Sequence, residues 1–331
     1  MRITARLDPE LSATLVTARP LRFGSGEDPS EDRPAHVRAA SGLTHVGDRL
    51  AIVQDDSNFI ILVDPRVADV RYLPLPRGPG GARQFDDDRG NKRFKLDLES
   101  CTAVPSSNGT AIIAFGSGST AEREQVAWVV DPASDSARVE LRRAQSFYLA
   151  LRAETRFSGS QLNLEGVIYE GGRIRLINRG NGARRDGLVA INATVDLDWK
   201  SLERYLLDPL HEAVPPLLDV TTYELGWLDG VPLGFTDAAA LGSSVLYTAA
   251  AEISPDVTLD GPVVGSAIGI ISGDSARWTP LRTADGELFG GKVEGITIDP
   301  KKPGTVYLVV DRDDPAQASE LCVAALAGPW L

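Results

Sequence analysis

Short apolar runs separated by polar turns recur along the whole chain. After Ser41, for example, residues 43–46, 50–53 and 59–63 form three such runs in succession. Runs of this length, bounded by Gly, Asp, Asn or Ser, predict short antiparallel strands joined in a meander. The same succession of runs begins again at four later points of the sequence, so the meander is a repeat.

Each repeat opens with a polar residue, then a small residue, then an apolar run. The opening pairs are Ser41-Gly42, Glu99-Ser100, Glu165-Gly166, Asp237-Ala238 and Glu294-Gly295. A four-stranded propeller blade needs roughly 40–50 residues, and every repeat has room for one blade plus a loop or a helix. We therefore predict an all-β fold, a five-bladed β-propeller in one domain spanning residues 1–331. Six blades are less favoured, because a sixth would fit only in the gap that runs through the termini.

The intervals between the apolar runs suggest a few departures from the repeat. Residues 145–155 and 199–206 predict short helical insertions, the second with Asp198 as its N-cap. The apolar residues 188–191 predict the third strand of the third blade. The last repeat supplies only three strands, whereas residues 2–7 alternate polar and apolar side chains. We expect this N-terminal strand to complete the last blade, which would leave no open sheet edge at the closure.

Composition narrows the classes of partner and location. The chain has 331 residues, 43% of them hydrophobic, and a net charge of −12. A phosphate backbone demands clustered Lys and Arg, so the charge argues against nucleic acid as a partner. No apolar run reaches the length of a membrane span, and the N-terminus shows no signal peptide. We expect a cytoplasmic protein without a membrane partner. Cys101 and Cys322 lie in strand-like runs and read as buried free thiols.

The opening residues of the repeats predict a ring around the propeller axis. The first strand of each blade lines the central channel, so equivalent residues face one mouth. These residues are Ser41, Glu99, Glu165, Asp237 and Glu294. Converging carboxylates need protons, basic neighbours or a metal ion. Oxygen ligands suit calcium, and no histidine adjoins the ring. The alternative is that the acids cap backbone N–H groups or pair with Lys95 and Lys292.

Polar residues at the ends of the second strands are expected at the same mouth. Asp55 and Asp56 follow the second strand of the first blade, while Arg179 and Arg312 follow those of the third and fifth. The arginines suit bidentate binding of phosphate or carboxylate, and the aspartates suit holding a water or a second cation. These four residues are our candidate catalytic group. The alternative is that they are ordinary turn formers with structural ion pairs.

The ring of Ser41, Glu99, Glu165, Asp237 and Glu294 resembles that of the calcium-activated nucleotidases, or soluble apyrases. Those proteins are five-bladed propellers with an axial calcium held by a Ser-Glu-Glu-Ser-Glu arrangement. The resemblance implies that Ser41 and the three glutamates bind calcium, and Asp237 departs from the pattern. Leu164-Glu165-Gly166 and Asn178-Arg179-Gly180 also look like the broader phytase-like propeller group.

The function expected from these features is calcium-dependent hydrolysis of a phosphorylated small molecule. Two alternatives stay open: a non-catalytic propeller that binds a ligand or protein around a structural calcium, and a lactone or ester hydrolase. No nucleophile elbow, Walker loop or zinc-protease helix motif is present in the sequence.

Overall fold

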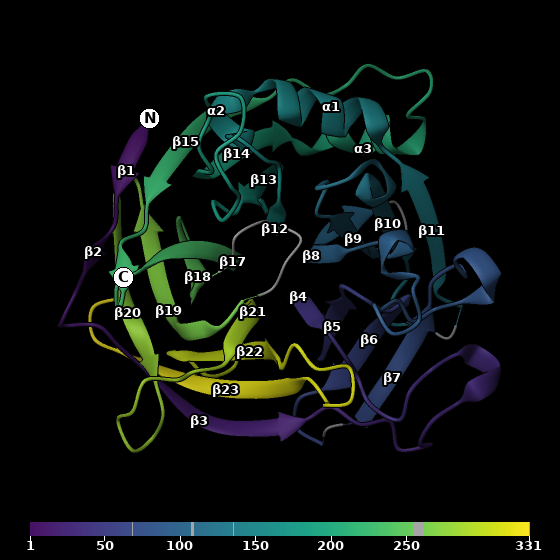
Figure 1. Ribbon diagram of the computed structural model, residues 1–331, viewed down its shortest axis with the longest axis horizontal. Helices are drawn as coiled ribbons and strands as arrows, with labels where there is room; N and C mark the ends of the chain where they lie inside the picture. Colours follow the sequence, from purple (N-terminus) through teal and green to yellow (C-terminus); the bar gives the residue numbers. More distant parts are fainter. Residues whose placement is uncertain (68, 107–108, 135, 254–260, 331) are drawn as a thin grey trace.

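The strands form five four-stranded antiparallel blades, and parallel pairing of β1 with β15 and of β20 with β3 extends or joins some of them into larger sheets. The blades are arranged in a ring around a central axis (Figure 1). The computed structural model describes residues 1–67, 69–106, 109–134, 136–253 and 261–330. The all-β, five-bladed propeller predicted from the repeat is confirmed. The strands of the first blade are β4 (Ala40–Val46), β5 (Arg49–Gln54), β6 (Phe59–Asp64) and β7 (Asp69–Pro74). Those of the second are β8 (Leu98–Ser106), β9 (Gly109–Gly116), β10 (Gln125–Val130) and β11 (Arg138–Arg143).

The remaining three blades follow the same order from the axis outward. The third contains β12 (Leu164–Glu170), β13 (Arg173–Asn178), β14 (Asn192–Asp198) and β15 (Leu218–Glu224). The fourth contains β17 (Val231–Leu241), β18 (Ser244–Glu252), β19 (Val263–Ser272) and β20 (Ser275–Arg282), preceded by the short β16 (Trp227–Leu228). The fifth contains β21 (Lys292–Ile298), β22 (Thr305–Asp311), β23 (Glu320–Ala327) and β3 (Ser12–Pro20).

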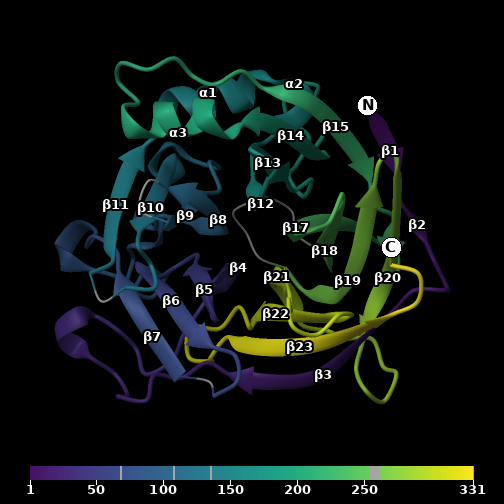
Figure 2. The same cartoon turned by 180° about the vertical axis from the view of Figure 1, so that it is seen from behind.

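The ring closes through the N-terminal segment, but not through the residues that we expected. Strand β3 pairs antiparallel with β23 and so provides the outer strand of the fifth blade. The prediction that residues 2–7 would do this was wrong. They form β1 (Arg2–Thr4), which pairs parallel with β15, and β2 (Arg6–Leu7), which pairs parallel with β20. The segment therefore joins the outer edges of three successive blades (Figure 2).

Helices fill the rim beside the second and third blades. Helix α1 (Gln145–Ala153), α2 (Thr155–Ser158) and α3 (Trp199–Leu207) lie together there (Figure 1). Asp198 caps α3 as predicted, because its Oδ1 accepts a hydrogen bond from the backbone N–H of Ser201 at 2.8 Å. The third strand of this blade begins at Asn192, so the strand predicted at residues 188–191 was wrong. Within the described residues, four 3₁₀ turns are also present: η1 (Pro29–Glu31), η2 (Pro79–Gly81), η3 (Lys92–Phe94) and η4 (Ala121–Arg123).

The hydrophobic core lies between neighbouring blades. Buried Val, Ile, Leu and aromatic side chains of one sheet pack on those of the next, and each inner strand contacts the inner strand of the following blade, with β21 returning to β4. Cys101 and Cys322 are buried and free, as predicted. In the described part of the chain, no helix is both long and apolar enough to cross a membrane.

Candidate metal centre

A β-bulge interrupts the inner strand of every blade at the same level of the channel. The extra residue is Glu99 in β8, Glu165 in β12 and Glu294 in β21. In β4 the register shift covers Ser41 and Gly42. A bulge bends its strand and re-aims the side chain of the extra residue. Ser41 and the three glutamates therefore occupy equivalent positions, as the repeat predicted.

The fourth blade differs from the prediction by one residue. The extra residue of the bulge in β17 is Thr236, because Phe235 pairs with Ala249 while Asp237 already pairs with Thr248. Thr236 is fully buried and donates from Oγ1 to Thr248 Oγ1 at 2.9 Å.

Asp237 takes the place that a small residue holds in the other blades. Its Oδ2 accepts a hydrogen bond from the backbone N–H of Ile296, in the next inner strand, at 2.9 Å. A Cβ at the equivalent Gly295 would lie 2.5 Å from the carbonyl oxygen of Ser41, so the inner strands approach closely at this level. Thr236, rather than Asp237, is thus equivalent to Ser41 and the glutamates, and we call Ser41, Glu99, Glu165, Thr236 and Glu294 the axial ring.

Hydrogen bonds orient the side chains of the axial ring. Ser41 donates from Oγ to Glu99 Oε2 at 2.8 Å, which links the first two blades. Asn163, two residues before Glu165, donates from Nδ2 to Glu165 Oε1 at 2.6 Å. The bond holds the side chain of Asn163, which lies just before β12, beside that of Glu165.

Basic side chains pair with carboxylates around the axial ring. Lys292 Nζ lies 2.7 Å from Glu294 Oε1, and Arg179 Nη1 lies 3.5 Å from Glu165 Oε1. Pairing with Lys292, the alternative to a bound cation that the sequence left open, is therefore present at Glu294. Lys95 instead forms ion pairs with Asp55 and, at 2.6 Å, with Asp97. Part of the negative charge is therefore balanced within the protein.

The carboxyl groups around the axial ring nevertheless have raised pKa values. Burial, followed by repulsion from Asp55, Asp97 and Glu165, raises the pKa of Glu99 well above its usual value. Burial raises the pKa of Glu165 to about 8, with Glu294 adding to the rise and Arg179 opposing it. Burial likewise raises the pKa of Glu294, and that of Asp55 to about 6. A further positive charge at this place would favour the ionised forms.

Two observations bear on whether the residues fit such a cation. Carboxylate oxygens of Asp55, Asp97 and Glu99 come within 4.8 Å of one another. In the part of the chain that the structure describes, the buried Oε2 of Glu294 has no hydrogen-bond partner, although the residue is only 6% exposed. An all-oxygen set of carboxylates and hydroxyls with an open acceptor fits calcium and gives none of the nitrogen or sulfur ligands that zinc prefers.

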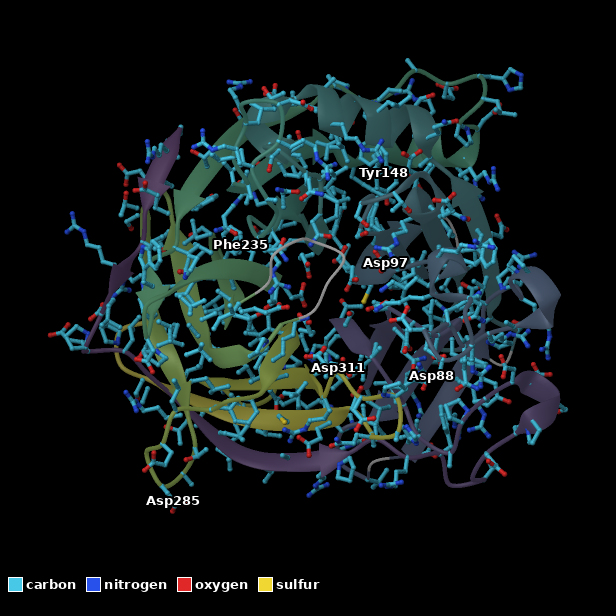
Figure 3. The ribbon with its side chains drawn as sticks, viewed as in Figure 1. Asp88, Asp97, Tyr148, Phe235, Asp285 and Asp311 are labelled. Atoms are coloured by element: carbon cyan, nitrogen blue, oxygen red, sulfur yellow. The ribbon has the colours of Figure 1, made fainter. Side chains whose placement is uncertain are left out.

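A pocket of about 280 Å³ opens beside the axial ring, between the first and fifth blades. Ser41 and Glu294 contribute to its lining, together with Asp55, Asp56 and Asp311 from the ends of β5 and β22. Asp55, Asp56 and Asp311 therefore lie beside the ring, as we expected for residues at the ends of the second strands. Figure 3 shows Asp97 and Asp311, from the second and fifth blades, near the middle of the molecule.

The two arginines of the candidate catalytic group lie elsewhere. Arg179 is 3% exposed and pairs with Glu252 at 2.5 Å as well as with Glu165. Arg312 forms an ion pair with Glu320. Neither arginine lines the pocket. The predicted phosphate clamp is therefore not formed, because both guanidinium groups are held by carboxylates.

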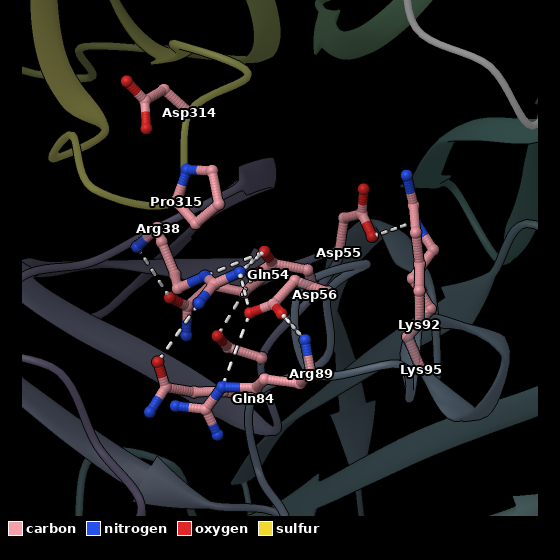
Figure 4. A network of polar contacts seen from close by, with 12 residues as sticks. Arg38, Gln54, Asp55, Asp56, Gln84, Arg89, Lys92, Lys95, Asp314 and Pro315 are labelled. Carbon is pink, nitrogen blue, oxygen red and sulfur yellow. Dashed lines mark hydrogen bonds and ion pairs between the residues drawn. The ribbon is translucent and has the colours of Figure 1, made fainter.

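Sequence reasoning missed three buried charges, Arg38, Asp97 and Arg123. Arg38 donates from Nε to Asp56 Oδ2 at 2.8 Å and from Nη1 to Gln84 Oε1 at 3.2 Å, as Figure 4 shows. Arg123 pairs with Asp97 at 3.0 Å. Asp97 lies two residues before a ring glutamate, as Asn163 and Lys292 do. This shared position in the repeat could have identified Asp97 from the sequence.

Comparison with known proteins places the chain by family and by fold. The model of a "Family of unknown function (DUF6929)" matches residues 36–326. No curated protein shows significant similarity to the chain.

Three solved structures illustrate the similarity in fold. A GH43 β-1,3-galactosidase aligns at 9% identity with a TM-score of 0.50, covering 94% of this chain and 60% of that one. The Pan2 WD40 domain of Neurospora crassa aligns at 9% identity and a TM-score of 0.40, covering 97% of each chain. The calcium-binding protein regucalcin from Agrobacterium tumefaciens aligns at 8% identity and a TM-score of 0.40, covering 89% and 93%. The structural neighbours are propellers and include hydrolases.

Proposed function

Because the chain belongs to this family of unknown function, we propose from its own site that the protein is a calcium-dependent hydrolase of small esters. The observation that carries the proposal is the unpartnered, buried Oε2 of Glu294 on the wall of a pocket that Ser41 and Asp55 also line. A buried acceptor without a donor is costly unless a ligand satisfies it. The cation would be held by the axial ring.

The residues around the pocket have separable roles in this reaction. A calcium ion held by the axial ring would polarise the carbonyl oxygen of the ester. Asp55 lies beside Glu99, is oriented by Lys95, and accepts a proton from the attacking water. The water oxygen bonds to the acyl carbon, the bond to the alkoxy oxygen breaks, and the proton passes to that oxygen to release the alcohol. Asp56, held by Arg38, shapes the wall beside Asp55.

The choice of a carboxylic ester or lactone over a phosphate ester follows from the arginines. With Arg179 and Arg312 paired elsewhere, the positive charges at the pocket are Arg38 and three lysines, and each of them contacts a carboxylate. A phosphorylated substrate would enter this pocket without a free guanidinium clamp. Phosphate esters therefore serve as the comparison arm of the test.

The test measures initial rates on a panel of aryl esters, lactones, phosphate monoesters and nucleotides, each with calcium and with chelator. We expect turnover of an ester or lactone that chelator abolishes and that Asp55→Asn lowers at least about 100-fold, the scale of general-base catalysis. Asp285→Asn, a change at a distant hairpin, serves as control. If only phosphate esters were turned over with calcium, the assignment of a carboxylic ester or lactone as substrate would be wrong. If no member of the panel were turned over, the assignment as a hydrolase would be wrong.

A second candidate is a non-catalytic propeller in which the ion only stabilises the fold. The ion pairs of Lys292 with Glu294 and of Arg179 with Glu165 favour it, since they already balance part of the charge. This candidate expects calcium to raise the melting temperature while every substrate of the panel stays intact.

A further inference from the structure

A second layer of the channel lies directly beneath the axial ring. Its residues follow those of the ring by one position and are Gly42, Ser100, Gly166, Asp237 and Gly295. Glycine suits this layer because the inner strands, which surround the middle of the molecule in Figure 1, approach closely. A Cβ on Gly42, for example, would lie 2.7 Å from Cα of Ser100. Ser100 and Asp237 are the members of the second layer that carry polar side chains.

Both polar residues of the second layer hold an oxygen without a hydrogen-bond partner. Asp237 is 1% exposed, and its Oδ2 accepts the backbone N–H of Ile296, but its Oδ1 has no partner among the described residues. Ser100 is fully buried, and its Oγ likewise lacks a partner within the part of the chain that the structure describes. Buried polar atoms without partners are rare and costly. Two of them in one layer indicate a ligand that both oxygens contact.

The carboxyl group of Asp237 extends toward the axis of the propeller. Burial, and then the charge of Asp237, raises the pKa of the Cys101 thiol, although Cys101 belongs to the second blade and Asp237 to the fourth. Burial raises the pKa of Asp237 itself, whereas the backbone N–H groups of Ile296, Ala238 and Leu43 lower it. Residues of the first, second and fifth blades thus interact with one carboxyl group, which places it near the axis.

The channel continues below the second layer as a cavity of about 270 Å³. Inner-strand residues of all five blades line it, namely residues 43–45, 101–103, 167–169, 238–240 and 297–298. Leu43, Cys101 and Ala238 follow residues of the second layer directly, so the cavity begins where that layer ends. A ligand in the second layer therefore has access from the end of the channel opposite the axial ring.

The ligand has to balance a charge. Glu165 and Glu294 of the axial ring pair with Arg179 and Lys292, but over the described ranges no basic side chain forms an ion pair with Asp237. A buried carboxylate without a positive partner is costly, and a water molecule would leave its charge unbalanced. One carboxylate supplies one negative charge. A divalent ion would leave an excess positive charge roughly 3.3 Å, the rise of one strand residue, below the proposed calcium, whereas a singly charged ion repels that calcium less.

We propose that the second layer binds one alkali-metal cation, sodium or potassium, through Oδ1 of Asp237 and Oγ of Ser100. Asp237 then has two separate roles, because its Oδ2 holds the neighbouring inner strand at Ile296 while its Oδ1 binds the ion. The proposed site differs from the axial ring in its residues and in the charge of its ion, and it does not rest on the proposed hydrolysis.

The experiment measures the melting temperature of the calcium-free, full-length protein in sodium, potassium or tetramethylammonium chloride at equal concentration. Tetramethylammonium keeps the ionic strength constant but is too bulky to contact both oxygens. An ion that binds only the folded state stabilises it by mass action, so we expect sodium or potassium to raise the melting temperature by about 2 °C or more, with saturation. Equal melting temperatures in the three salts would overturn the proposal.

Four variants locate the ion. Asp237→Asn keeps an acceptor for the N–H of Ile296 but removes the charge, and Ser100→Ala removes the second oxygen. Both should lose at least half of the rise in melting temperature. The exposed Asp285 gives the control Asp285→Asn, which should keep the rise, as should Glu294→Gln in the axial ring. If Glu294→Gln abolished the rise while Ser100→Ala kept it, the ion would lie in the axial ring and the proposal would be wrong.

A second measurement tests whether the ion lies next to the proposed calcium. Two cations in adjacent layers repel each other, so sodium or potassium should weaken calcium binding by about fivefold or more at constant ionic strength. Asp237→Asn should remove this effect in calorimetric titrations. If calcium bound equally well in all three salts, the alkali ion would not lie beneath the ring and the proposal would be wrong. If calcium did not bind at all, the proposed function would fail, while the melting experiment would still decide this proposal.

Discussion

Ser41 donates a hydrogen bond from Oγ to Glu99 Oε2 at 2.8 Å, across 58 residues of sequence and between two blades. The bond orients the hydroxyl of Ser41 and the carboxyl group of Glu99 relative to each other at the mouth of the channel. Both residues lie at a bulge, so the geometry depends on the pairing of β4 with β5 and of β8 with β9. Neighbouring blades thus meet at a polar contact on the axis.

Replacing Ser41 with alanine should weaken calcium binding. The variant removes one ring oxygen and the hydrogen bond that orients Glu99. A hydrogen bond to a charged group contributes about 1.5–3 kcal/mol, so we expect the calcium dissociation constant to rise by roughly tenfold or more. Calorimetric titration measures the change, and Ser275→Ala, on an exposed hairpin, is the control. An unchanged constant would remove Ser41 from the site.

The stability of the metal-free protein should fall as the pH rises. Glu165 has a pKa raised to about 8 by burial, against 4.5 for an ordinary glutamate. Between these values the folded state binds more protons than the unfolded state, so raising the pH favours unfolding. Melting temperatures measured from pH 5 to pH 8 should therefore decrease, and Glu165→Gln should flatten the slope. Melting temperatures that rise over this interval would contradict the pKa direction.

Calcium should reverse that trend. Its carboxylate ligands must lose their protons on binding, so affinity is expected to increase with pH over the same range. Calorimetry in two buffers with different ionisation enthalpies would report the protons released. Binding without proton release would show that the ion does not contact the ring glutamates.

Thr236 and Asp237 should separate ion binding from folding. Asp237→Ala removes the acceptor for the N–H of Ile296 and should destabilise the fold by about 1–3 kcal/mol, the cost of a buried unpaired group. Asp237→Asn keeps an acceptor and should be milder. Thr236→Val should weaken calcium binding with little loss of stability. Denaturant unfolding measures the stability of the three variants, and calorimetry measures their calcium affinity. If Asp237→Ala lost calcium affinity and Thr236→Val did not, Asp237 would belong to the ring in place of Thr236.

The N-terminal segment should contribute stability although it lies far from the site. Ile3, in β1, is 4% exposed and belongs to the core of the third and fourth blades. Truncation of a buried isoleucine costs about 2–5 kcal/mol, so Ile3→Ala should lower the denaturation midpoint clearly. The exposed Arg6 gives the control variant Arg6→Ala. Equal midpoints for the two variants would mean that β1 is dispensable.

The repeat predicted the propeller and most of the ring because the features that define an inner strand lie close together in the sequence. An inner strand needs a small residue where Gly42 and Gly295 approach the neighbouring strand, and an apolar run after it. Both features are visible in the sequence. The shift from Asp237 to Thr236 was not visible, since a bulge is a property of two paired strands, and moving one residue turns the side chain to the other side.

The closing strand escaped prediction because it contributes little to the core. Of the residues in β3, Ala13 is buried while most others are exposed. An outer strand with water on much of its surface lacks the apolar pattern that identifies strands. Residues 2–7 alternate more clearly, but they pair in parallel with two other blades. Which strand closes the fifth blade, and where residues 2–7 pair, both depend on partner strands that are distant in the sequence.

The proposed function depends on a calcium ion on the propeller axis, bound by the ring glutamates. Anomalous diffraction from crystals grown with calcium tests it most directly. We expect one strong anomalous peak with oxygens of Glu99, Glu165 and Glu294 at the roughly 2.3–2.6 Å typical of calcium. A map without a peak at the ring, in crystals at saturating calcium, would contradict it.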